Sequence, residues 1–413
     1  MSRRVVVTGL GAVSPLGHSA GESWQSAIDG VSGVGSITQF DASDLLVQIA
    51  CEVKNFDADD YLDPKEARRR DRFEHFAAVS TMEALEQSGL EINEENAARV
   101  GVIISTATGG INTFEDAIKT IQEKGARRLS PFIIPMFMAN GAAGMVSIDI
   151  GAKGPSFSVA SACASGADGI GQAWMLIRGG MLDAAIAGGT EATICEMGVG
   201  AFDRLGALSR QNEDYSNTPA PFDKNRDGLV MGEGSGVLVL ESLEHAQSRG
   251  AQILAELVGY SATADAYHIT APAEGGAGGA AAMAQALDLA KVSYDQVDYI
   301  NAHGTGTELN DVAETQAVKS VFGDHAYDLA ISSTKSMTGH MMGATGALEA
   351  VFCVQAIESG LVPPTIHYQT PDPECDLDYV PNEARELPVE VAISNAFGFG
   401  GHNAVLAFKS FSG

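Results

Sequence analysis

One pattern occurs twice in the chain, as SFSVASACASGADGIGQ at residues 156–172 and as LAISSTKSMTGHMMGATG at residues 329–346. Each copy begins with a strand-like run, continues through a turn of small residues and enters a glycine- and alanine-rich helix start. A second pair, VGVIISTATGG at 100–110 and VDYINAHGTGT at 297–307, precedes the first pair in the same order. Repeats of this length predict two halves of one core rather than a solenoid. The alternative is that βα turns are similar in all α/β proteins.

Short β-branched runs bounded by glycine alternate with longer helical patterns along the chain. The predicted strands lie at residues 5–7, 102–104, 157–159, 184–187, 237–240, 253–258, 299–300, 330–332, 391–394 and 405–408. Helical composition and apolar spacing cover residues 73–88 and 278–291. This alternation predicts an α/β fold whose strands are covered on both faces. We expect an N-terminal half at residues 1–250 and a C-terminal half at residues 251–413, which together form one compact unit.

The chain is strongly acidic, with 53 aspartates and glutamates against 25 lysines and arginines and a net charge of −28. Nucleic acids and anionic membranes bind basic surfaces, so neither is expected as a partner. No apolar run is long enough to span a bilayer, and the strand at residues 5–7 leaves no room for a signal peptide before it. The five cysteines are odd in number and lack CxxC spacing, which disfavours disulfides and zinc pairs. A soluble, cytoplasmic protein is expected.

Cys163 is the candidate nucleophile. A strand-like run precedes it, and apolar residues at helical spacing follow it as far as Gly179. This position predicts a thiol at a helix N-terminus, where the positive end of the helix dipole lowers a thiol pKa. Small neighbours such as Ser161 and Gly166 leave space for a substrate. The other four cysteines are expected to be buried as small apolar residues, which is also the alternative for Cys163.

Two histidines lie where predicted strands end. His303 belongs to NAHGTGT, and His340 belongs to TKSMTGHMMGATG, where glycines bracket it before a helix that stops at Gly360. Active groups of α/β proteins gather at such strand ends. Most of the other seven histidines are expected to be structural or on the surface. A cysteine nucleophile with two imidazoles is therefore the candidate site.

Two glycine-rich segments allow different interpretations. SNAFGFGGHN at 394–403 would direct backbone N–H groups toward an oxyanion, or is simply a turn between strands. GLGAVSPLG at 9–17 is a poor dinucleotide loop, because Ser14 stands at the third glycine position and Pro15 follows it. The phosphate-binding pattern GxxxxGK[ST] does not occur.

The sequence resembles the elongating β-ketoacyl-acyl-carrier-protein synthases of the thiolase fold, most closely their synthase II group. The motifs that carry the resemblance are VVVTGLGAVSPLG at 5–17, SACASG at 161–166, PFDKNRDGLVMGEGSGVLVLE at 221–241, NAHGTGT at 301–307, TKSMTGHMMGATGALE at 334–349 and SNAFGFGGHN at 394–403. The resemblance implies two duplicated βαβαβαββ halves packed as a layered α/β/α/β/α core. Its Cys-His-His set differs from thiolases and from the initiating Cys-His-Asn synthases.

The resemblance also implies an activity. Cys163 would take an acyl chain from acyl carrier protein (ACP) as a thioester. His303 and His340 would bind the malonyl thioester carbonyl, promote decarboxylation and stabilise the enolate that attacks the acyl-cysteine. The backbone N–H groups of Cys163 and Phe399 would hold the tetrahedral oxyanion of acyl transfer. The product is a 3-oxoacyl-ACP, formed with CO2 and free ACP in fatty-acid elongation.

Further residues match family positions. The resemblance assigns orientation of the imidazoles to Lys335 and Glu349, the pantetheine arm to Thr305 and Thr307, the acyl pocket to Phe202, Thr108 and Ile133, and gating to Phe399. Thr108 and Ile133 stand where relatives often have Ile and Phe, so the pocket is not expected to be shorter. No cofactor is required, because the substrate travels on the phosphopantetheine of ACP. A structural Na+ or K+ would match Asn301, Glu349, Ser394 and Asn395.

Basic clusters in this acidic chain fall where the family binds its carrier protein. The expected docking residues are Lys65, Arg68, Arg69, Lys124, Arg127, Arg128 and Arg204. Arg70 and Arg72 belong to the first cluster, and Gly206 stands where close relatives carry Arg, so Arg204 is expected to substitute. The alternative is a solvated helix face. The family also forms part of its acyl pocket across a dimer interface, so a homodimer is expected.

Other functions were weighed against fatty-acid elongation. A ketosynthase subunit of a dissociated polyketide or specialised-lipid pathway would share the chemistry and differ in product. A catalytically silent partner of carrier protein is disfavoured by the intact set of Cys163, His303 and His340. A degradative thiolase is disfavoured by the motif around His340.

Overall fold

The computed structural model describes residues 2–412, and a mixed sheet of ten strands organises it. The strands are β1 (Val5–Val13), β4 (Val100–Ser105), β5 (Ser156–Phe157), β6 (Ala184–Glu191), β7 (Gly234–Ser242), β8 (Ala255–Ala264), β9 (Tyr299–Asn301), β10 (Ala330–Ser332), β13 (Val391–Gly398) and β14 (His402–Lys409). Their order in the sheet is β10-β9-β13-β14-β8-β1-β7-β6-β4-β5. All ten predicted strands are present, with shifted ends.

The two ends of the sheet repeat one topology. Counted from the first strand of each half, β5-β4-β6-β7-β1 and β10-β9-β13-β14-β8 follow the same order. The halves meet at β1 and β8, where Val6 and Val7 pair with Glu256 and Ala255. In each half the strands that lead to candidate site residues are parallel, β4 with β5 and β6, and β9 with β10 and β13. The predicted duplicated α/β fold is confirmed.

Thirteen α-helices surround and separate the two parts of the sheet in the described residues. They are α1 (Ala20–Ile28), α2 (Pro64–Ala67), α3 (Arg72–Ser88), α4 (Ile111–Lys124), α5 (Ile133–Phe137), α6 (Gly141–Ile150), α7 (Ser165–Arg178), α8 (Glu196–Arg204), α9 (Leu243–Ser248), α10 (Ala277–Ala290), α11 (Glu308–Phe322), α12 (Lys335–Thr338) and α13 (Thr345–Ser359). Two further sheets have two strands each. One pairs β2 (Gly35–Ser36) with β3 (Ile49–Ala50), and the other pairs β11 (Leu361–Val362) with β12 (Arg385–Glu386).

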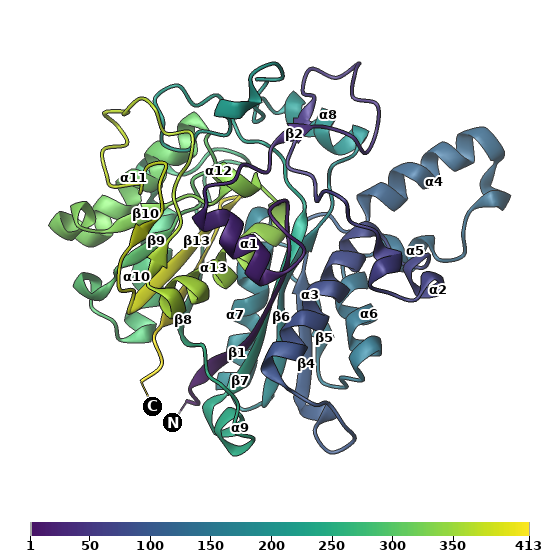
Figure 1. Cartoon of the computed structure of the whole chain (residues 1–413), viewed down its shortest axis with the longest axis horizontal. Helices are drawn as coiled ribbons and strands as arrows, with labels where there is room; N and C mark the ends of the chain where they lie inside the picture. The colour runs from purple at the N-terminus through teal and green to yellow at the C-terminus, as the bar shows by residue number, and fades with distance from the viewer. Residues whose placement is uncertain (1, 413) are drawn as a thin grey trace.

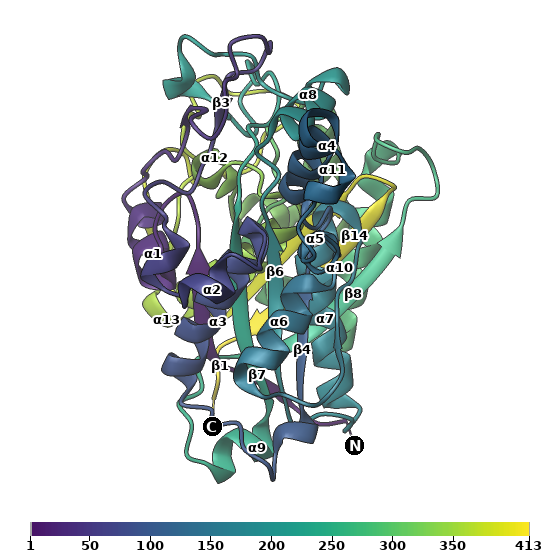
Figure 2. The same cartoon turned by 90° about the vertical axis from the view of Figure 1, so that its right-hand side faces the viewer.

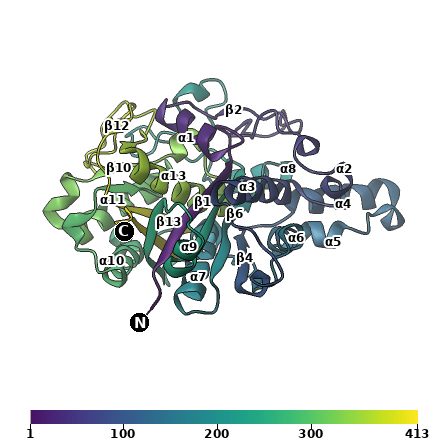
Figure 3. The ribbon, with the colours of Figure 1, turned by 60° about the horizontal axis from the view of Figure 1, so that its bottom comes forward.

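The helices and strands form five layers (Figure 1). The outer layer of the N-terminal half contains α3 and α6, and that of the C-terminal half contains α10 and α11. Helices α7 and α13 pack against each other and against strands of both halves. Viewed from below, the two outer layers lie on opposite sides of the molecule (Figure 3).

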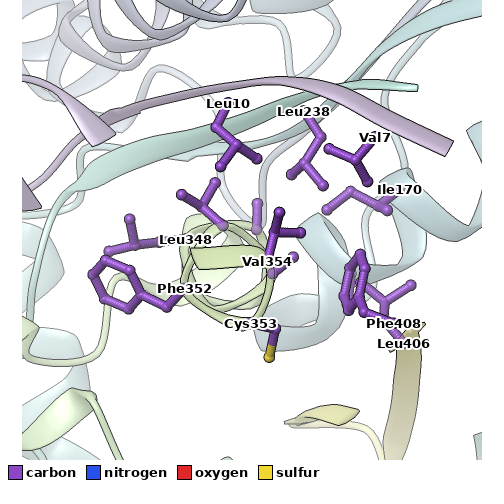
Figure 4. Packing of buried hydrophobic residues seen from close by; sticks show 14 of the residues in the cluster. Val7, Leu10, Ile170, Leu238, Leu348, Phe352, Cys353, Val354, Leu406 and Phe408 are labelled. Atoms are coloured by element: carbon purple, nitrogen blue, oxygen red, sulfur yellow. The ribbon is translucent and has the colours of Figure 1, made fainter. Parts of the chain in front are cut away.

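Strand periodicity explains the layers. Val237 and Val239 of β7 pack toward α3, while Leu238 and Leu240 of the same strand pack toward α7 and α13. Because successive side chains of a strand point to opposite faces, a strand covered on both faces must be apolar throughout. Helix α13 is likewise buried almost all round, and Figure 4 shows its Leu348, Phe352 and Val354 amid strand and helix side chains. This rigid centre carries the residues at the strand ends.

One excursion of the chain, from α4 to α5 (residues 111–137), extends away from the layered body. Helix α4 projects sideways beyond the sheet (Figure 1), and α2, α5 and α6 lie on the same side (Figure 2). Its apolar side chains include Phe114, Ile118 and Ile121, which are 39%, 39% and 45% exposed. Within residues 2–412, no helix combines the length and apolar character needed to cross a membrane.

Candidate active site

Cys163 lies in a 3-10 helix of one turn, η4 (Ala162–Ala164), between β5 and α7. Ala162 has a φ of 51°, in the left-handed region that non-glycine residues rarely adopt. Such strain at a turn persists where the surrounding structure fixes it, and it is concentrated at functional sites. The strand-to-helix position predicted for Cys163 is confirmed, and the turn presents the thiol at the start of a 14-residue helix.

His303 and His340 come from loops that follow neighbouring parallel strands. His303 follows β9, and its backbone N–H donates to Glu314 Oε1 at 2.8 Å. His340 follows β10 and α12; its backbone N–H donates to Val230 O at 2.7 Å, and its Nδ1 lies 3.0 Å from Thr345 Oγ1. The two ring centroids are 5.4 Å apart. Backbone bonds therefore fix both loops, and a side-chain contact also orients the His340 ring.

The structure brings Cys163, His303 and His340 to one cavity of about 460 Å³. This volume is within the range of small-molecule sites. Thr305 and Thr307 also line the cavity, and their hydroxyl oxygens are 2.9 Å apart. Phe202 and Phe399 line it too; their rings stack with centroids 6.4 Å apart. The cavity thus combines a thiol, two imidazoles, two hydroxyls and an aromatic wall.

Burial dominates the electrostatics of the nucleophile. It raises the pKa of the Cys163 thiol to about 11, although the backbone N–H of Phe399, the Lys335 ammonium and the backbone N–H of Cys163 each lower that pKa. The lowered pKa predicted for Cys163 from its helix position is therefore wrong. Desolvation of the thiolate outweighs the helix terminus. The sequence places the helix but does not reveal how completely the turn is covered.

Two backbone segments meet at the nucleophile turn. The backbone N–H groups of Phe399 and Cys163 each lower the pKa of the Cys163 thiol. Gly398 allows this approach, because a Cβ at that position would lie 2.8 Å from Ser161 O and 3.0 Å from Cys163 N. The predicted loop at 394–403 therefore packs directly on the nucleophile turn. Two convergent N–H donors are what a tetrahedral oxyanion requires.

Both imidazoles are neutral. Burial lowers the pKa of His303 and of His340 well below the usual range, and the Lys335 ammonium lowers both further. Lys335 Nζ donates to Glu349 Oε1 at 2.6 Å, and both side chains are buried. Burial raises the pKa of Glu349 to about 7, against the opposing effect of Lys335. Neutral rings can each present one N–H to a ligand oxygen.

Several buried polar atoms lack a partner beside Lys335 and Glu349. Glu349 Oε2, Ser394 Oγ and Asn301 Nδ2 are buried and accept or donate no hydrogen bond. Asn301 and Ser394 are register partners in β9 and β13. The two partnerless oxygens, Glu349 Oε2 and Ser394 Oγ, fit a hard cation. Asn395 differs from the expectation, because its amide donates to Glu314 from the opposite face of β13.

Two expected pocket residues lie outside this cavity. Thr108 is half-buried, and its hydroxyl donates to Glu191 Oε1 at 2.5 Å. Ile133 begins α5 and is half-buried. Neither contributes to the lining that contains Cys163 in the described chain.

The expected docking residues are exposed. Lys65, Arg68, Arg69, Lys124, Arg127, Arg128 and Arg204 all have exposed side chains. Arg69 lies over the Phe132 ring at 5.0 Å, which places α2 beside the segment that joins α4 to α5. Arg204 adjoins Leu205 and Gly206, which line the cavity.

The first basic cluster is smaller than the sequence indicates. Arg70 is buried and forms a two-pronged ion pair with Asp149, at 2.6 and 2.7 Å. Arg72 pairs with the buried carboxylate of Glu233 at 2.7 Å. Both arginines therefore belong to the interior rather than to the solvated cluster. Their partners are 79 and 161 residues away, so local sequence could not reveal them.

Sequence analysis missed two buried carboxylates beside the site, Glu314 and Glu191. Glu314 accepts from the backbone N–H groups of His303 and Gly304, at 2.8 and 2.7 Å. Glu191 ends β6 and accepts from the backbone N–H of Gly343. For Glu191 the available signal was a single acidic residue at the end of an apolar strand, because such a residue needs buried donors. Glu314 lies within α11, where no comparable local pattern marks it.

The fold is that of a β-ketoacyl synthase. The family model of the β-ketoacyl synthase N-terminal domain matches residues 2–246, and that of the C-terminal domain matches residues 254–369. The chain therefore belongs to the β-ketoacyl synthase family.

Within this family, the chain is similar to several named proteins. The chain is 52% identical over 409 residues to the 3-oxoacyl-[acyl-carrier-protein] synthase 2 of Synechocystis, covering 99% of this chain and 98% of that protein. It is also 52% identical to the synthase of the same name from Staphylococcus aureus strain COL, covering 99% of each. A solved type II polyketide synthase ketosynthase in complex with its acyl-carrier protein is 35% identical, with a TM-score of 0.91 over 100% of both chains.

Proposed function

We propose that the chain is an acyltransferase that elongates fatty acids as a 3-oxoacyl-ACP synthase. The observation that carries this proposal is the convergence of Cys163, His303 and His340 on one cavity, which Phe399 also lines. The 52% identical relatives are named for this reaction. The polyketide ketosynthase is less similar, at 35% identity, so fatty-acid elongation is favoured over a polyketide pathway.

The first step transfers the acyl chain. The Cys163 sulfur adds to the thioester carbonyl of acyl-ACP, and the oxyanion forms between the two backbone N–H groups. The bond from carbonyl carbon to pantetheine sulfur then breaks, and free ACP thiol leaves with the proton from Cys163. Because burial raises the pKa of the thiol to about 11, the proton leaves as the sulfur attacks. The N–H groups favour the charged state over the resting thiol.

The second step uses both imidazoles. The malonyl thioester oxygen sits between His303 and His340, which donate one N–H each. The bond from the α-carbon to the carboxylate breaks, CO2 leaves, and the electron pair forms an enolate. The enolate carbon attacks the acyl-Cys163 carbonyl, the bond from that carbonyl to the Cys163 sulfur breaks, and the released thiolate takes up a proton from solvent to restore the thiol. Burial lowers the pKa of His303 and of His340, so both imidazoles are neutral. Each can then stabilise the enolate by donating its one N–H.

ACP is an acidic partner, so an acidic chain needs a local basic surface to bind it. The overall charge of −28 would repel an acidic partner, but Lys65, Arg68, Arg127 and Arg128 provide local exposed positive charge. The pantetheine arm would enter the cavity past Arg204 and reach the hydroxyls of Thr305 and Thr307. The solved relative in complex with its acyl-carrier protein supports ACP as the partner.

We further propose a homodimer with part of the acyl pocket at its interface. The excursion at α4 and α5 carries exposed apolar side chains, including Phe114, Ile118, Ile134 and Phe137. Clustered exposed apolar side chains of this kind mark protein interfaces. Thr108 and Ile133, which match the family's acyl pocket, lie at the base of this excursion rather than in the cavity around Cys163.

A monovalent cation, Na+ or K+, would fit beside the Lys335–Glu349 pair. Glu349 Oε2 and Ser394 Oγ would hold it, because these two buried oxygens otherwise lack partners, and the amide oxygen of Asn301 would be a third ligand. When bound, the cation would supply positive charge to the second oxygen of Glu349. The side-chain amide of Asn395 donates to Glu314 instead.

Intact-protein mass spectrometry tests the proposed function. Wild type, Cys163→Ala and the matched control Cys375→Ala are incubated with octanoyl- to hexadecanoyl-ACP, and malonyl-ACP is then added. Cys375 is a suitable control because it is buried outside the cavity. The expected result is acyl mass gain on wild type and Cys375→Ala only, discharged by malonyl-ACP as 3-oxoacyl-ACP. No mass gain on any protein would overturn the proposal.

A further inference from the structure

A second buried carboxylate stands beside the nucleophile, and the two proposed steps do not use it. Glu191 ends β6 and is 0% exposed. It lies close enough to the thiol for its negative charge to raise the pKa of Cys163. Its side chain accepts five hydrogen bonds, all from neutral donors in two segments of the chain. A buried carboxylate held only by neutral donors is costly and indicates a specific structural demand.

The two oxygens of Glu191 hold different segments. Oε1 accepts from Thr106 Oγ1 at 2.8 Å, from Thr108 Oγ1 at 2.5 Å and from Thr108 N at 3.2 Å. Oε2 accepts from Ala107 N at 2.7 Å and from Gly343 N at 3.0 Å. Residues 106–108 follow β4, whereas Gly343 belongs to the turn η9 (Met342–Ala344), three residues after His340. One carboxylate therefore connects the N-terminal half to the His340 loop.

The backbone at Gly343 fits tightly where these segments meet. A Cβ on Gly343 would lie 2.4 Å from Ala107 N and 2.7 Å from Glu191 Oε2. A Cβ on Gly166 of the nucleophile helix, or on Gly189 of β6, would lie 2.6 Å from Gly343 O. The carbonyl side of Gly343 thus packs on the helix that follows Cys163, while its N–H binds Glu191. A shift of this turn would change the distance between His340 and the nucleophile.

We propose that Glu191 is a positioning residue that holds the His340 loop in register with the Cys163 helix, through its bond from Gly343 N. The proposal rests on the proposed function, in which His340 binds the malonyl thioester oxygen. Glu191 contacts neither substrate nor imidazole; it acts through the backbone between Gly343 and His340. It is therefore needed for decarboxylation more than for acyl transfer, which uses the N–H groups of Cys163 and Phe399.

Glutamine is an informative replacement because it keeps the shape and removes one acceptor. In Glu191→Gln, the three donors at Oε1 retain the amide oxygen there, and the amide NH₂ then faces Ala107 N and Gly343 N. Two donors cannot bond to each other, so the tether to Gly343 is lost. A displacement of about 1 Å at a reacting group lowers rates by about a hundredfold. We expect malonyl-ACP decarboxylation to fall by about tenfold to a hundredfold.

The experiment compares both partial reactions in Glu191→Gln with those of wild type. Decarboxylation of malonyl-ACP is followed by CO2 release, and acyl transfer by mass gain on Cys163. The expected result is a lower kcat for decarboxylation, with KM for malonyl-ACP and the acyl-transfer rate each within about threefold of wild type. The matched control is Glu83→Gln, because Glu83 of α3 also accepts from two backbone N–H groups, Ala12 and Ala20, but lies far from the cavity. It should leave both reactions unchanged.

Hydrogen–deuterium exchange of the peptide spanning 341–346 provides a readout that does not depend on activity. Glu191→Gln should lose protection in this peptide, and Glu191→Asp, which keeps an ionised acceptor, should recover part of the protection and part of the decarboxylation rate. Glu191→Asp also replaces the glutamine variant if the latter does not fold. Unchanged decarboxylation, an equal loss of both partial reactions, or unchanged exchange would overturn the proposal. If wild type does not decarboxylate malonyl-ACP, the proposed function fails, and exchange alone decides whether Glu191 holds Gly343.

Discussion

The imidazole rings of His303 and His340 stand almost perpendicular, at 86°, with their centroids 5.4 Å apart. They meet because β9 and β10 are parallel neighbours, with Tyr299 opposite Ala330, and their loops leave from the same edge of the sheet. Both rings are buried and neutral. Two neutral N–H donors that converge on one cavity are suited to a single oxygen that gains charge during reaction.

Replacing either histidine by alanine should separate the two steps. His303→Ala and His340→Ala are each expected to lower malonyl-ACP decarboxylation by about 10² to 10³, the usual loss for one donor at an oxyanion. Acyl transfer should persist, because the oxyanion of that step binds backbone N–H groups. The measurements are CO2 release and acyl mass gain on Cys163.

A matched control for these variants is His325→Ala. Its Nε2 lies 3.0 Å from Val297 O, at the far end of α11, so the substitution removes an imidazole contact outside the cavity. Both steps should continue at the wild-type rate. Full decarboxylation by either His303→Ala or His340→Ala would contradict the two-donor arrangement.

Gly398 should be intolerant of a methyl group. In Gly398→Ala, the new Cβ would meet Ser161 O at 2.8 Å and Cys163 N at 3.0 Å. Relief of this contact must move the Phe399 N–H away from the sulfur or distort the nucleophile turn. We expect acyl transfer to fall by about tenfold to a hundredfold, with little change in melting temperature. Gly200→Ala is the control, because a Cβ on Gly200 of α8 would meet only Leu45 Cδ2, at 4.0 Å. A wild-type rate for Gly398→Ala would exclude this loop from oxyanion binding.

The local parts of the fold and site were predictable from sequence, whereas their surroundings were not. Cys163 was placed correctly because a strand, a small-residue turn and a helix are consecutive in the chain. The proximity of His303 and His340 followed from parallel strands with a common edge. The prediction of a lowered pKa for Cys163 was wrong, because distant segments, such as the loop at Gly398, determine how deeply the thiol is buried. Arg70 and Arg72 were assigned to a surface cluster because their partners, Asp149 and Glu233, are distant in sequence.

Glu74 should make stability depend on pH. It is the N3 residue of α3, with Oε2 bonded to the N-cap N–H of Asp71, and Oε1 is buried without a partner. Burial raises the pKa of Glu74 from 4.5 to about 8. An acid with a raised pKa in the folded state contributes its full stability below the unfolded pKa. That stability is lost as pH rises from about 4.5 to about 8, at up to about 1.4 kcal/mol per pH unit.

The isosteric variant Glu74→Gln cannot ionise, so it tests this dependence. The free energy of unfolding of Glu74→Gln minus that of wild type should increase as pH rises from 5 to 8. Above pH 8 this difference should level off. Urea unfolding across this range measures the effect. Glu86→Gln serves as a control on the same helix, because Glu86 is exposed and the substitution removes the same charge. A constant difference between Glu74→Gln and wild type would show that Glu74 is ionised in the folded protein.

Charge introduced on the α4 excursion should disrupt the proposed dimer. Ile118 of α4 is 39% exposed and lies among other exposed apolar side chains. Ile118→Glu would place an unpaired carboxylate in a buried interface, which costs several kcal/mol. Light scattering coupled to size exclusion should report a monomer for Ile118→Glu and a dimer for wild type. Leu46→Glu, at a 59% exposed position in a loop, should remain dimeric. A dimer of Ile118→Glu would place the interface elsewhere.

Reversal of charge at α2 should weaken ACP binding without affecting the chemistry. Lys65 and Arg68 are exposed, whereas Arg69 is engaged with Glu66 and Phe132. In the double variant Lys65→Glu, Arg68→Glu, KM for acyl-ACP should rise by about tenfold at low salt, and the difference from wild type should shrink as salt screens the charges. Acylation of Cys163 by a short pantetheine thioester without the carrier should continue at the wild-type rate.

Lys153→Glu is the matched control, because Lys153 is an exposed basic residue in the loop between α6 and β5. It changes the net charge but not the proposed docking cluster, so KM should rise little. An equal rise for Lys153→Glu and a single Arg68→Glu variant would indicate that overall charge, rather than α2, governs carrier association. A loss of acylation by the short thioester would instead indicate damage to the cavity. Docking at α2 requires a rise in KM that is specific to the carrier, specific to this cluster and sensitive to salt.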